Sequence, residues 1–192
     1  TDYLVLDGVY FGLASFFLNF KIIKANQGPD VFYHFFNRLN EARGKAFFLG
    51  STQLVLDKIK KRSNINFPKI KINTFSPPFE ESFSNFDNNI ILKKINKANP
   101  DILFIGMTCP KQEKWIHNNK NKLKPMLVIT IGNVFDWFAG TQKSISPIWF
   151  KLKLGWFIRI IYRPEIFKRN IINQLIFFWH LALFMLKFKR HD

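Results

Sequence analysis

The 192-residue sequence contains one cysteine, Cys109, and few acidic side chains. A lone cysteine excludes an internal disulfide and a cysteine-based zinc site, which fits a reducing cytosol. No basic segment followed by an apolar core stands near Thr1, so no signal peptide is visible. The 13 Asp and Glu are outnumbered by 29 Lys and Arg, a formal charge of +16. This excess indicates an anionic partner: nucleic acid, anionic lipid or a phosphorylated substrate.

Long hydrophobic runs are also absent. The apolar run Leu175 to Leu186 is interrupted by His180 and is shorter than the ~20 residues that span a bilayer. Basic residues flank it on both sides. Basic charge around aromatic and aliphatic side chains is typical of a helix lying in an anionic membrane surface. The alternative is a buried helix of a larger core or of a homo-oligomer. His180 is interpreted as a single polar position on this helix and not as a ligand.

Hydrophobic residues make up 47% of the chain, which is enough to bury the core of one domain. Several short segments are rich in β-forming residues and bounded by turn residues, which predicts strands. They are Tyr3–Leu6, Lys45–Leu49, Lys69–Phe75, Asp101–Ile105 and Met126–Ile131.

Helical spacing of apolar side chains predicts four helices between these strands. The first follows Asp30 as a candidate N-cap and ends before Gly44. The others are expected at Gln53–Arg62, Asn88–Ala98 and Lys111–Lys122. This alternation predicts an α/β fold, a Rossmann-like and mainly parallel sheet with helices on both faces.

The expected organisation is a Rossmann-like core at residues 1–142 and a basic, aromatic-rich helical appendage at 143–192 that associates with membranes. Ligands of such sheets bind at the carboxyl ends of the strands. The turns that leave the strands at Asp7, Gly106 and Gly132 are therefore the candidate sites. The one long excursion is the loop "SPPFEESFSN", Ser76–Asn85.

The first turn, "LVLDGVYFG", places Asp7 and Gly8 after an apolar strand. An Asp-Gly pair forms a turn or a helix N-cap in many proteins. At this edge of the sheet the Asp7 carboxylate could also act as a general base. The residues alone leave both interpretations open.

The second turn, "GMTCPKQEKWI", has features of an anion site. Gly106 allows a close backbone turn, Pro110 suits a first helical position, and N–H groups at that helix end would point toward an anion. Gln112 could hydrogen-bond a sugar or uracil amide, while Lys111 and Lys114 add positive charge.

The same segment also fits an ordinary capped surface helix, with Glu113 near its positive end. Cys109 is interpreted as a small filler rather than a nucleophile, because nothing in the sequence marks a partner base.

The third turn, "IGNVFDWFAGT", surrounds Asp136 with aromatic residues. Phe135, Trp137 and Phe138 are expected in the core, and Asp136 is expected to cap a helix or to pair with an Arg. A metal role is not expected, since no second carboxylate or His lies at ligand spacing.

Several motifs occur in an order that resembles the WecG/TagA/CpsF glycosyltransferases, also called glycosyltransferase family 26. They are "DGVYFG", "GPD", "FFLGS", "SPPF", "NPDILFIGMTCPKQEKWI", "IGNVFDWFAGT" and "SPIWFKLKLGWFIRIIYRPE". The resemblance runs from Tyr3 to about Arg169 and is most specific around Pro110–Glu113.

The resemblance implies an inverting transferase that needs neither a metal nor another cofactor. Such an enzyme moves N-acetylmannosamine, or its uronic acid, from UDP to polyprenyl-diphosphate-linked N-acetylglucosamine. The products feed wall teichoic acid, enterobacterial common antigen or capsule. The implied location is cytoplasmic and peripheral, on the inner face of the cell membrane.

Carried over by position, the resemblance makes Asp7 the catalytic base and Gln112 the active-site amide, with Arg159 at the nucleotide diphosphate. Without a metal, the charge of departing UDP must be met by N–H groups and cations, and inversion needs one base. The residues expected to bind substrate are Gly8, Gly106, Thr108, Pro110, Lys111, Gln112, Glu113, Asp136, Arg159 and Arg163.

The sequence departs from the family pattern at three places. Gly155 stands where a Glu is usual, Lys24 or Ala25 where an Arg precedes "GPD", and Arg163 where an acidic residue is expected. Family members also begin earlier, with a strand and helix carrying an Asn and a Thr near the donor. A sheet that lacks a strand exposes an edge and an apolar face, which favours a fragment over a minimal enzyme.

The charge and the predicted fold are also compatible with two other functions. A nucleic-acid-binding module would explain the charge. However, the sequence shows no zinc-finger spacing, no aromatic RNP signature and no clear helix-turn-helix, and its Phe residues fall at core periodicity. An inactive, truncated paralogue that scaffolds other envelope enzymes would keep the fold and membrane binding without turnover.

Overall fold

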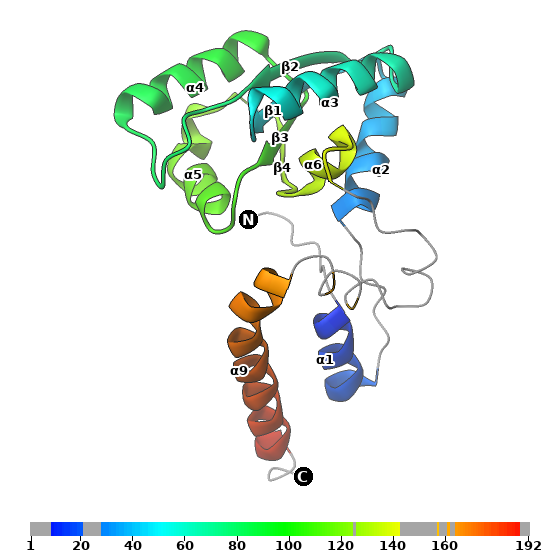
Figure 1. Cartoon of the computed structure of the whole chain (residues 1–192), viewed down its shortest axis with the longest axis vertical. Helices are drawn as coiled ribbons and strands as arrows, with labels where there is room; N and C mark the ends of the chain where they lie inside the picture. Colours follow the sequence, from blue (N-terminus) through cyan, green and yellow to red (C-terminus); the bar gives the residue numbers. More distant parts are fainter. Residues whose placement is uncertain are drawn as a thin grey trace. The chain divides into compact units, whose positions relative to one another are not determined.

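The computed structural model describes residues 9–20, 28–124, 126–142, 157, 161 and 164–188. The chain forms two compact units (Figure 1). The sheet unit is Gln27–Lys143, and the helical unit combines Thr1–Asn26 with Ser144–Asp192. The functional division into residues 1–142 and 143–192 stays a prediction.

The sheet unit contains a four-stranded parallel sheet in the order β2-β1-β3-β4. The strands are β1 (Lys45–Gly50), β2 (Lys71–Phe75), β3 (Ile102–Gly106) and β4 (Leu127–Thr130). The predicted parallel α/β fold is thus confirmed, and each of these strands begins within two residues of its predicted start. The predicted strand Tyr3–Leu6 lies outside the described residues.

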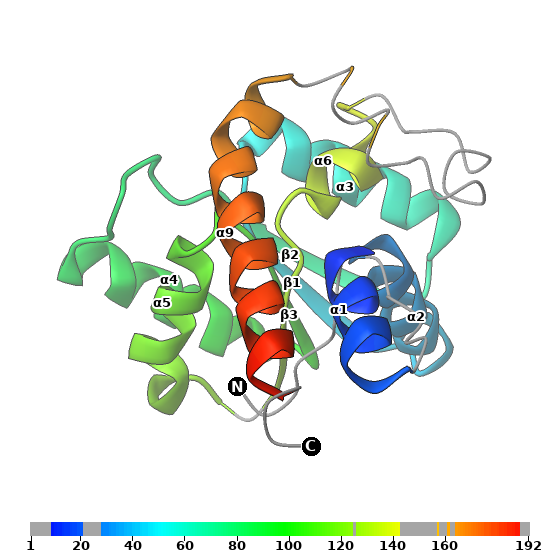
Figure 2. The ribbon, with the colours of Figure 1, turned by 90° about the horizontal axis from the view of Figure 1, so that it is seen from below.

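Helices cover both faces of this sheet (Figure 2). The helical elements of the unit are α2 (Gly28–Glu41), α3 (Gln53–Asn66), α4 (Asn85–Ala98), α5 (Lys111–Asn119), the short 3-10 helix η1 (Lys120–Lys122) and α6 (Val134–Ala139). Side chains alternate along each strand, so Phe48 and Phe104 pack with α2, α3 and α6. Phe47 and Leu103 pack with α4 and α5 on the other face.

Aromatic rings fill the core on the α2 face. Phe32 stacks on Phe36 with ring centroids 4.8 Å apart, and Phe48 stacks on Phe104 at 5.2 Å. The rings of Phe32 and Phe138 approach to 4.8 Å. Buried aromatic pairs contribute about 0.5–1.5 kcal/mol each beyond their buried area. The core role expected for the phenylalanines of the third turn is confirmed, whereas Trp137 is only partly buried.

Three helix starts differ from the predictions. Helix α2 begins at Gly28, so Asp30 lies in its first turn and is not its N-cap. Pro29 fits the same turn because its missing N–H needs no partner there. Helix α4 begins at Asn85, since the Ser84 hydroxyl accepts from the Asp87 N–H at 3.1 Å. Pro110 occupies the position before α5 instead of its first helical position.

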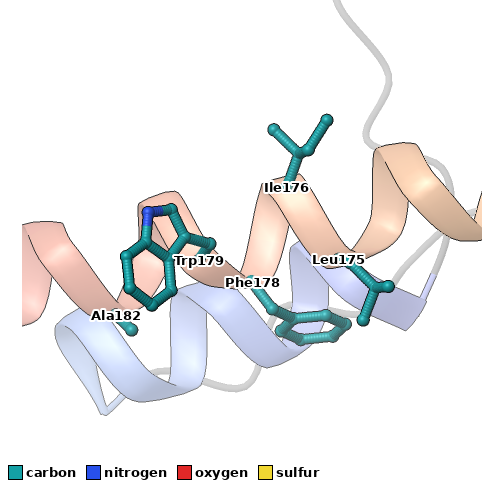
Figure 3. A pocket seen from close by; sticks show the side chains of 5 residues that line it. All are labelled: Leu175, Ile176, Phe178, Trp179 and Ala182. Atoms are coloured by element: carbon teal, nitrogen blue, oxygen red, sulfur yellow. The ribbon is translucent and has the colours of Figure 1, made fainter.

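The helical unit contains α1 (Val9–Asn19) and α9 (Pro164–Phe188). Apolar side chains of α9 line an open pocket of about 550 Å³ (Figure 3). They are Leu175, Ile176, Phe178, Trp179 and Ala182. Within the residues that the structure describes, no helix has the length and apolar character needed to cross a membrane.

Candidate active site

Two glycines shape the carboxyl edge of the sheet. Gly50 and Gly106 are register partners at the ends of β1 and β3. Gly50 has φ +119, and a Cβ there would lie 2.4 Å from the Gly106 carbonyl oxygen. A Cβ on Gly106 would lie 2.5 Å from the ring of Phe135. The structure thus shows a packing reason for glycine at 106, the ring of Phe135 in the first turn of α6, while the ligand role expected for Gly106 stays a prediction.

The turn after β3 leads into α5 through Thr108. The Thr108 carbonyl accepts the N–H groups of Lys111 and Gln112 at 2.8 and 3.4 Å. The Pro110 carbonyl accepts the Lys114 N–H at 3.1 Å. Two of the N–H groups expected to face an anion are therefore engaged within the turn. Direct ligand contacts by Thr108 and Pro110 stay predictions.

Gln112 is buried at the start of α5, with 7% of its surface exposed. Its Nε2 donates to Glu113 Oε1 at 2.8 Å. Its Oε1 is buried and has no hydrogen-bond partner among the described residues. Leaving a buried acceptor unpaired costs about 1–3 kcal/mol, so this oxygen is suited to receive a donor from a ligand.

Lys111 points to the loop of residues 76–84, which joins β2 to α4. Its Nζ donates to the Glu80 carbonyl and lies 3.9 Å from the centroid of the Phe83 ring. Burial lowers the pKa of Lys111 by disfavouring the charged ammonium, and the Glu80 carboxylate partly opposes this shift. The side chain expected to add charge for a ligand thus holds the 76–84 loop against α5.

Further hydrogen bonds fix both ends of this loop. Ser76 Oγ donates to the Ser51 carbonyl at 2.7 Å. Asn88 Nδ2 donates to the Phe83 carbonyl at 3.1 Å, and Asn88 Oδ1 accepts from Trp115 Nε1 at 2.8 Å. The loop, α4 and α5 are therefore joined. The sequence marks this loop as a long excursion, but no spacing in it indicates the link to α5.

Cys109 is exposed, so its expected role as a small filler is wrong. Three effects raise the pKa of its thiol: first the partial desolvation of the sulfur, although the residue as a whole is exposed, then repulsion by the Glu113 carboxylate, and a hydrogen bond with Glu113. All three favour the thiol over the nucleophilic thiolate. The expectation that Cys109 is no nucleophile agrees with this environment.

Asp136 closes the end of α6. Its Oδ1 accepts from Thr141 Oγ1 at 3.0 Å, and its carbonyl accepts from the Thr141 N–H at 3.0 Å. Asn133 and Gln142 exchange two side-chain hydrogen bonds of 2.8 Å beside it. Among the described residues the Asp136 carboxylate therefore pairs with Thr141, where a helix cap or a nearby Arg was expected. Substrate binding by Asp136 stays a prediction.

Four predicted site residues lie outside the described residues: Asp7, Gly8, Arg159 and Arg163. Their roles stay predictions. Among the residues that are described, no three His, Cys, Asp or Glu side chains gather where they could hold a metal ion.

The fold defines a class of protein, the open parallel α/β sheets, whose ligands generally bind at the carboxyl ends of the strands. The model of the glycosyl transferase WecG/TagA/CpsF family matches residues 1–191, and the chain belongs to this family. The resemblance drawn from the motifs is confirmed. This membership gives no support to a nucleic-acid-binding module.

Curated relatives carry the name N-acetylglucosaminyldiphosphoundecaprenol N-acetyl-beta-D-mannosaminyltransferase. A relative from Bacillus subtilis (strain 168) is 29% identical over 172 residues, covering 89% of this chain and 65% of the relative. One from Bacillus spizizenii is 23% identical over 171 residues, covering 89% and 65%. One from Staphylococcus aureus (strain NCTC 8325 / PS 47) is 25% identical over 161 residues, covering 84% and 61%. The chain thus spans less than two thirds of their length.

Proposed function

We propose that this chain catalyses the inverting, metal-independent transfer of an N-acetylmannosamine-type sugar from UDP. The acceptor is polyprenyl-diphosphate-linked N-acetylglucosamine, and the product enters a teichoic acid or another envelope polysaccharide. Family membership and the names of the curated relatives support this proposal.

The observation that carries the proposal is the buried carbonyl oxygen of Gln112, which has no hydrogen-bond partner in the part of the chain that the structure describes. It follows the central strand β3, on the edge where such sheets bind ligands. A sugar nucleotide offers amide N–H groups in its uracil ring and in its N-acetyl group. Either one would satisfy the oxygen that the described residues leave without a donor.

In the proposed reaction the acceptor hydroxyl oxygen bonds to the anomeric carbon as the bond from that carbon to the diphosphate breaks. Asp7 takes the hydroxyl proton, and the electron pair of the broken bond leaves with UDP. Arg159 and Arg163 meet the negative charge of the departing diphosphate. No second carboxylate is needed in this scheme.

The proposed location is the inner face of the cell membrane, where the protein is cytoplasmic and peripheral. Helix α9 supports this location, because Leu175 and Trp179 are about two-thirds exposed, at 64% and 65%. Such a surface can lie among lipid headgroups beside a polyprenyl-linked acceptor.

Two substitutions test the proposal in a transfer assay with UDP-N-acetylmannosamine and a short-chain acceptor analogue. Gln112→Leu should weaken donor binding in calorimetry about tenfold while leaving the fold intact, since it removes an acceptor to which no described residue donates. Asp7→Asn should retain donor binding and lower turnover about 10²- to 10⁴-fold, the usual loss of a general base.

Asn118→Leu is the matched control, because it removes an exposed amide from the same helix, beyond the first turn that holds Gln112. It should change donor affinity less than threefold. Unchanged donor affinity in Gln112→Leu would reject the placement of the donor at α5. Full turnover in Asp7→Asn, or loss of turnover with EDTA, would reject the proposed mechanism.

A further inference from the structure

The outward side of α3 carries a basic stripe. Lys58, Lys61, Arg62 and Ile65 follow one another at intervals of three, one and three residues, so they share one side of the helix. The buried side of α3 is different and consists of Val55, Leu56, Ile59 and Ser63. This stripe is therefore not needed for packing against the sheet.

The stripe borders a groove of about 350 Å³. Figures 1 and 2 show α6 beside α3. Ala139, the last residue of α6, is among the residues that line the groove. Lys58, Lys61, Arg62 and Ile65 line it together with Asn66. Among the described residues that line the groove, none is acidic.

Arg62 is held in place within this groove. Its Nη1 donates to the Phe138 carbonyl at 2.9 Å, and its guanidinium carbon lies 5.3 Å from the centroid of the Phe138 ring. A guanidinium carries several N–H donors in a rigid plane. One bond to the end of α6 therefore orients the group and leaves further donors for an anionic ligand at little entropic cost.

Ile65 distinguishes this surface from a plain cationic patch. It is 70% exposed and lies one helical turn beyond Lys61 and Arg62. An apolar side chain next to cations matches the interface of an anionic membrane, where phosphates lie above acyl chains. Nucleic-acid sites instead place aromatic rings among the cations to stack on bases, and no aromatic side chain is among the described residues that line the groove.

We propose that this α3–α6 groove is a second membrane contact, which binds the phosphates of anionic lipids and inserts Ile65 at the headgroup boundary. It belongs to the sheet unit, whereas α9 belongs to the helical unit. The unit that contains Gln112 thus has its own attachment to the lipid surface. The proposal does not depend on which sugar is transferred.

The test compares two double variants of the 192-residue chain by sedimentation with phosphatidylcholine vesicles that contain phosphatidylglycerol. Lys58→Gln with Lys61→Gln should lower the apparent vesicle affinity about 30-fold, since each Lys near an anionic surface contributes about 1 kcal/mol. Lys93→Gln with Lys97→Gln removes the same charge from exposed positions of α4, on the other face of the sheet. This control should lose less than threefold.

Several results would overturn the proposal. Equal losses in both pairs would show that net charge alone matters. Displacement from vesicles by millimolar glycerol phosphate would indicate a site for a soluble phosphate. A larger loss of retention on DNA than of vesicle binding would indicate a nucleic-acid surface. Adding Ile65→Ser to the Lys58 and Lys61 double variant should weaken vesicle binding beyond the loss caused by the two lysines. Equal thermal midpoints would confirm that all variants are folded.

Discussion

Burial and one neighbouring carboxylate set the chemistry of Cys109. Its pKa is raised from the ordinary value of 9.0, first by burial and then by Glu113. The folded protein therefore holds this proton to higher pH than the unfolded chain does. The resulting stabilisation is present below pH 9 and is lost as the pH rises through the folded-state pKa. The thiol is mostly exposed, so this contribution to stability is small.

Glu113→Gln should lower the pKa of Cys109 toward its ordinary value, because it removes the repulsion that disfavours the thiolate. We expect alkylation of Cys109 by iodoacetamide at pH 8 to become several-fold faster. The measurement is the alkylation rate against pH, followed by mass spectrometry. Glu41→Gln at the end of α2 is the control and should leave the rate unchanged. Equal rates in both variants would show that Glu113 does not influence the thiol.

At the scale of elements, Lys111 connects a loop to a helix. The 76–84 loop follows β2 and reaches α5 through the Glu80 carbonyl and the Phe83 ring. The same helix presents Gln112, whose buried oxygen marks the candidate donor site. The position of the loop and the position of the candidate site are thus set by adjacent residues of α5.

Lys111→Met should release the loop while keeping the aliphatic part of the side chain. We expect amide hydrogen exchange of the 76–84 segment to become about tenfold faster, which corresponds to about 1.4 kcal/mol and to a hydrogen bond with a charged donor. The rest of the sheet unit should exchange as before. Lys114→Met is the matched control on the same helix. Unchanged exchange in Lys111→Met would mean that the other hydrogen bonds hold the loop without it.

The sequence predicts the elements of this fold better than the contacts between them. The strands at Lys45 and Asp101 are evident because short β-rich segments end in turn residues, and local chemistry decides both features. The link from Lys111 to Glu80 joins residues 31 apart, and the link from Arg62 to Phe138 joins residues 76 apart. No spacing rule connects such residues, so only the folded chain brings them together.

At the scale of the whole molecule, a charge of +16 is shared between two units. On the sheet unit the α3–α6 groove gathers cations around an exposed Ile65. On the helical unit α9 exposes apolar side chains with spacing typical of one helix side, among them Ile172, Leu175 and Trp179. Both surfaces have the mixed character that peripheral membrane binding requires.

Leu175→Ser with Trp179→Ser should therefore weaken binding to anionic vesicles without changing turnover of a short, soluble acceptor analogue. The two side chains are 64% and 65% exposed, so their loss should not disturb packing. Each apolar group that leaves the interface removes about 25 cal/mol per Å² of buried surface, which predicts at least a tenfold loss of vesicle affinity. Leu54→Ser with Phe86→Ser is the control, because these exposed apolar residues belong to the sheet unit and lie outside both surfaces. If the α9 variant sediments with vesicles as the control does, α9 is not a membrane anchor.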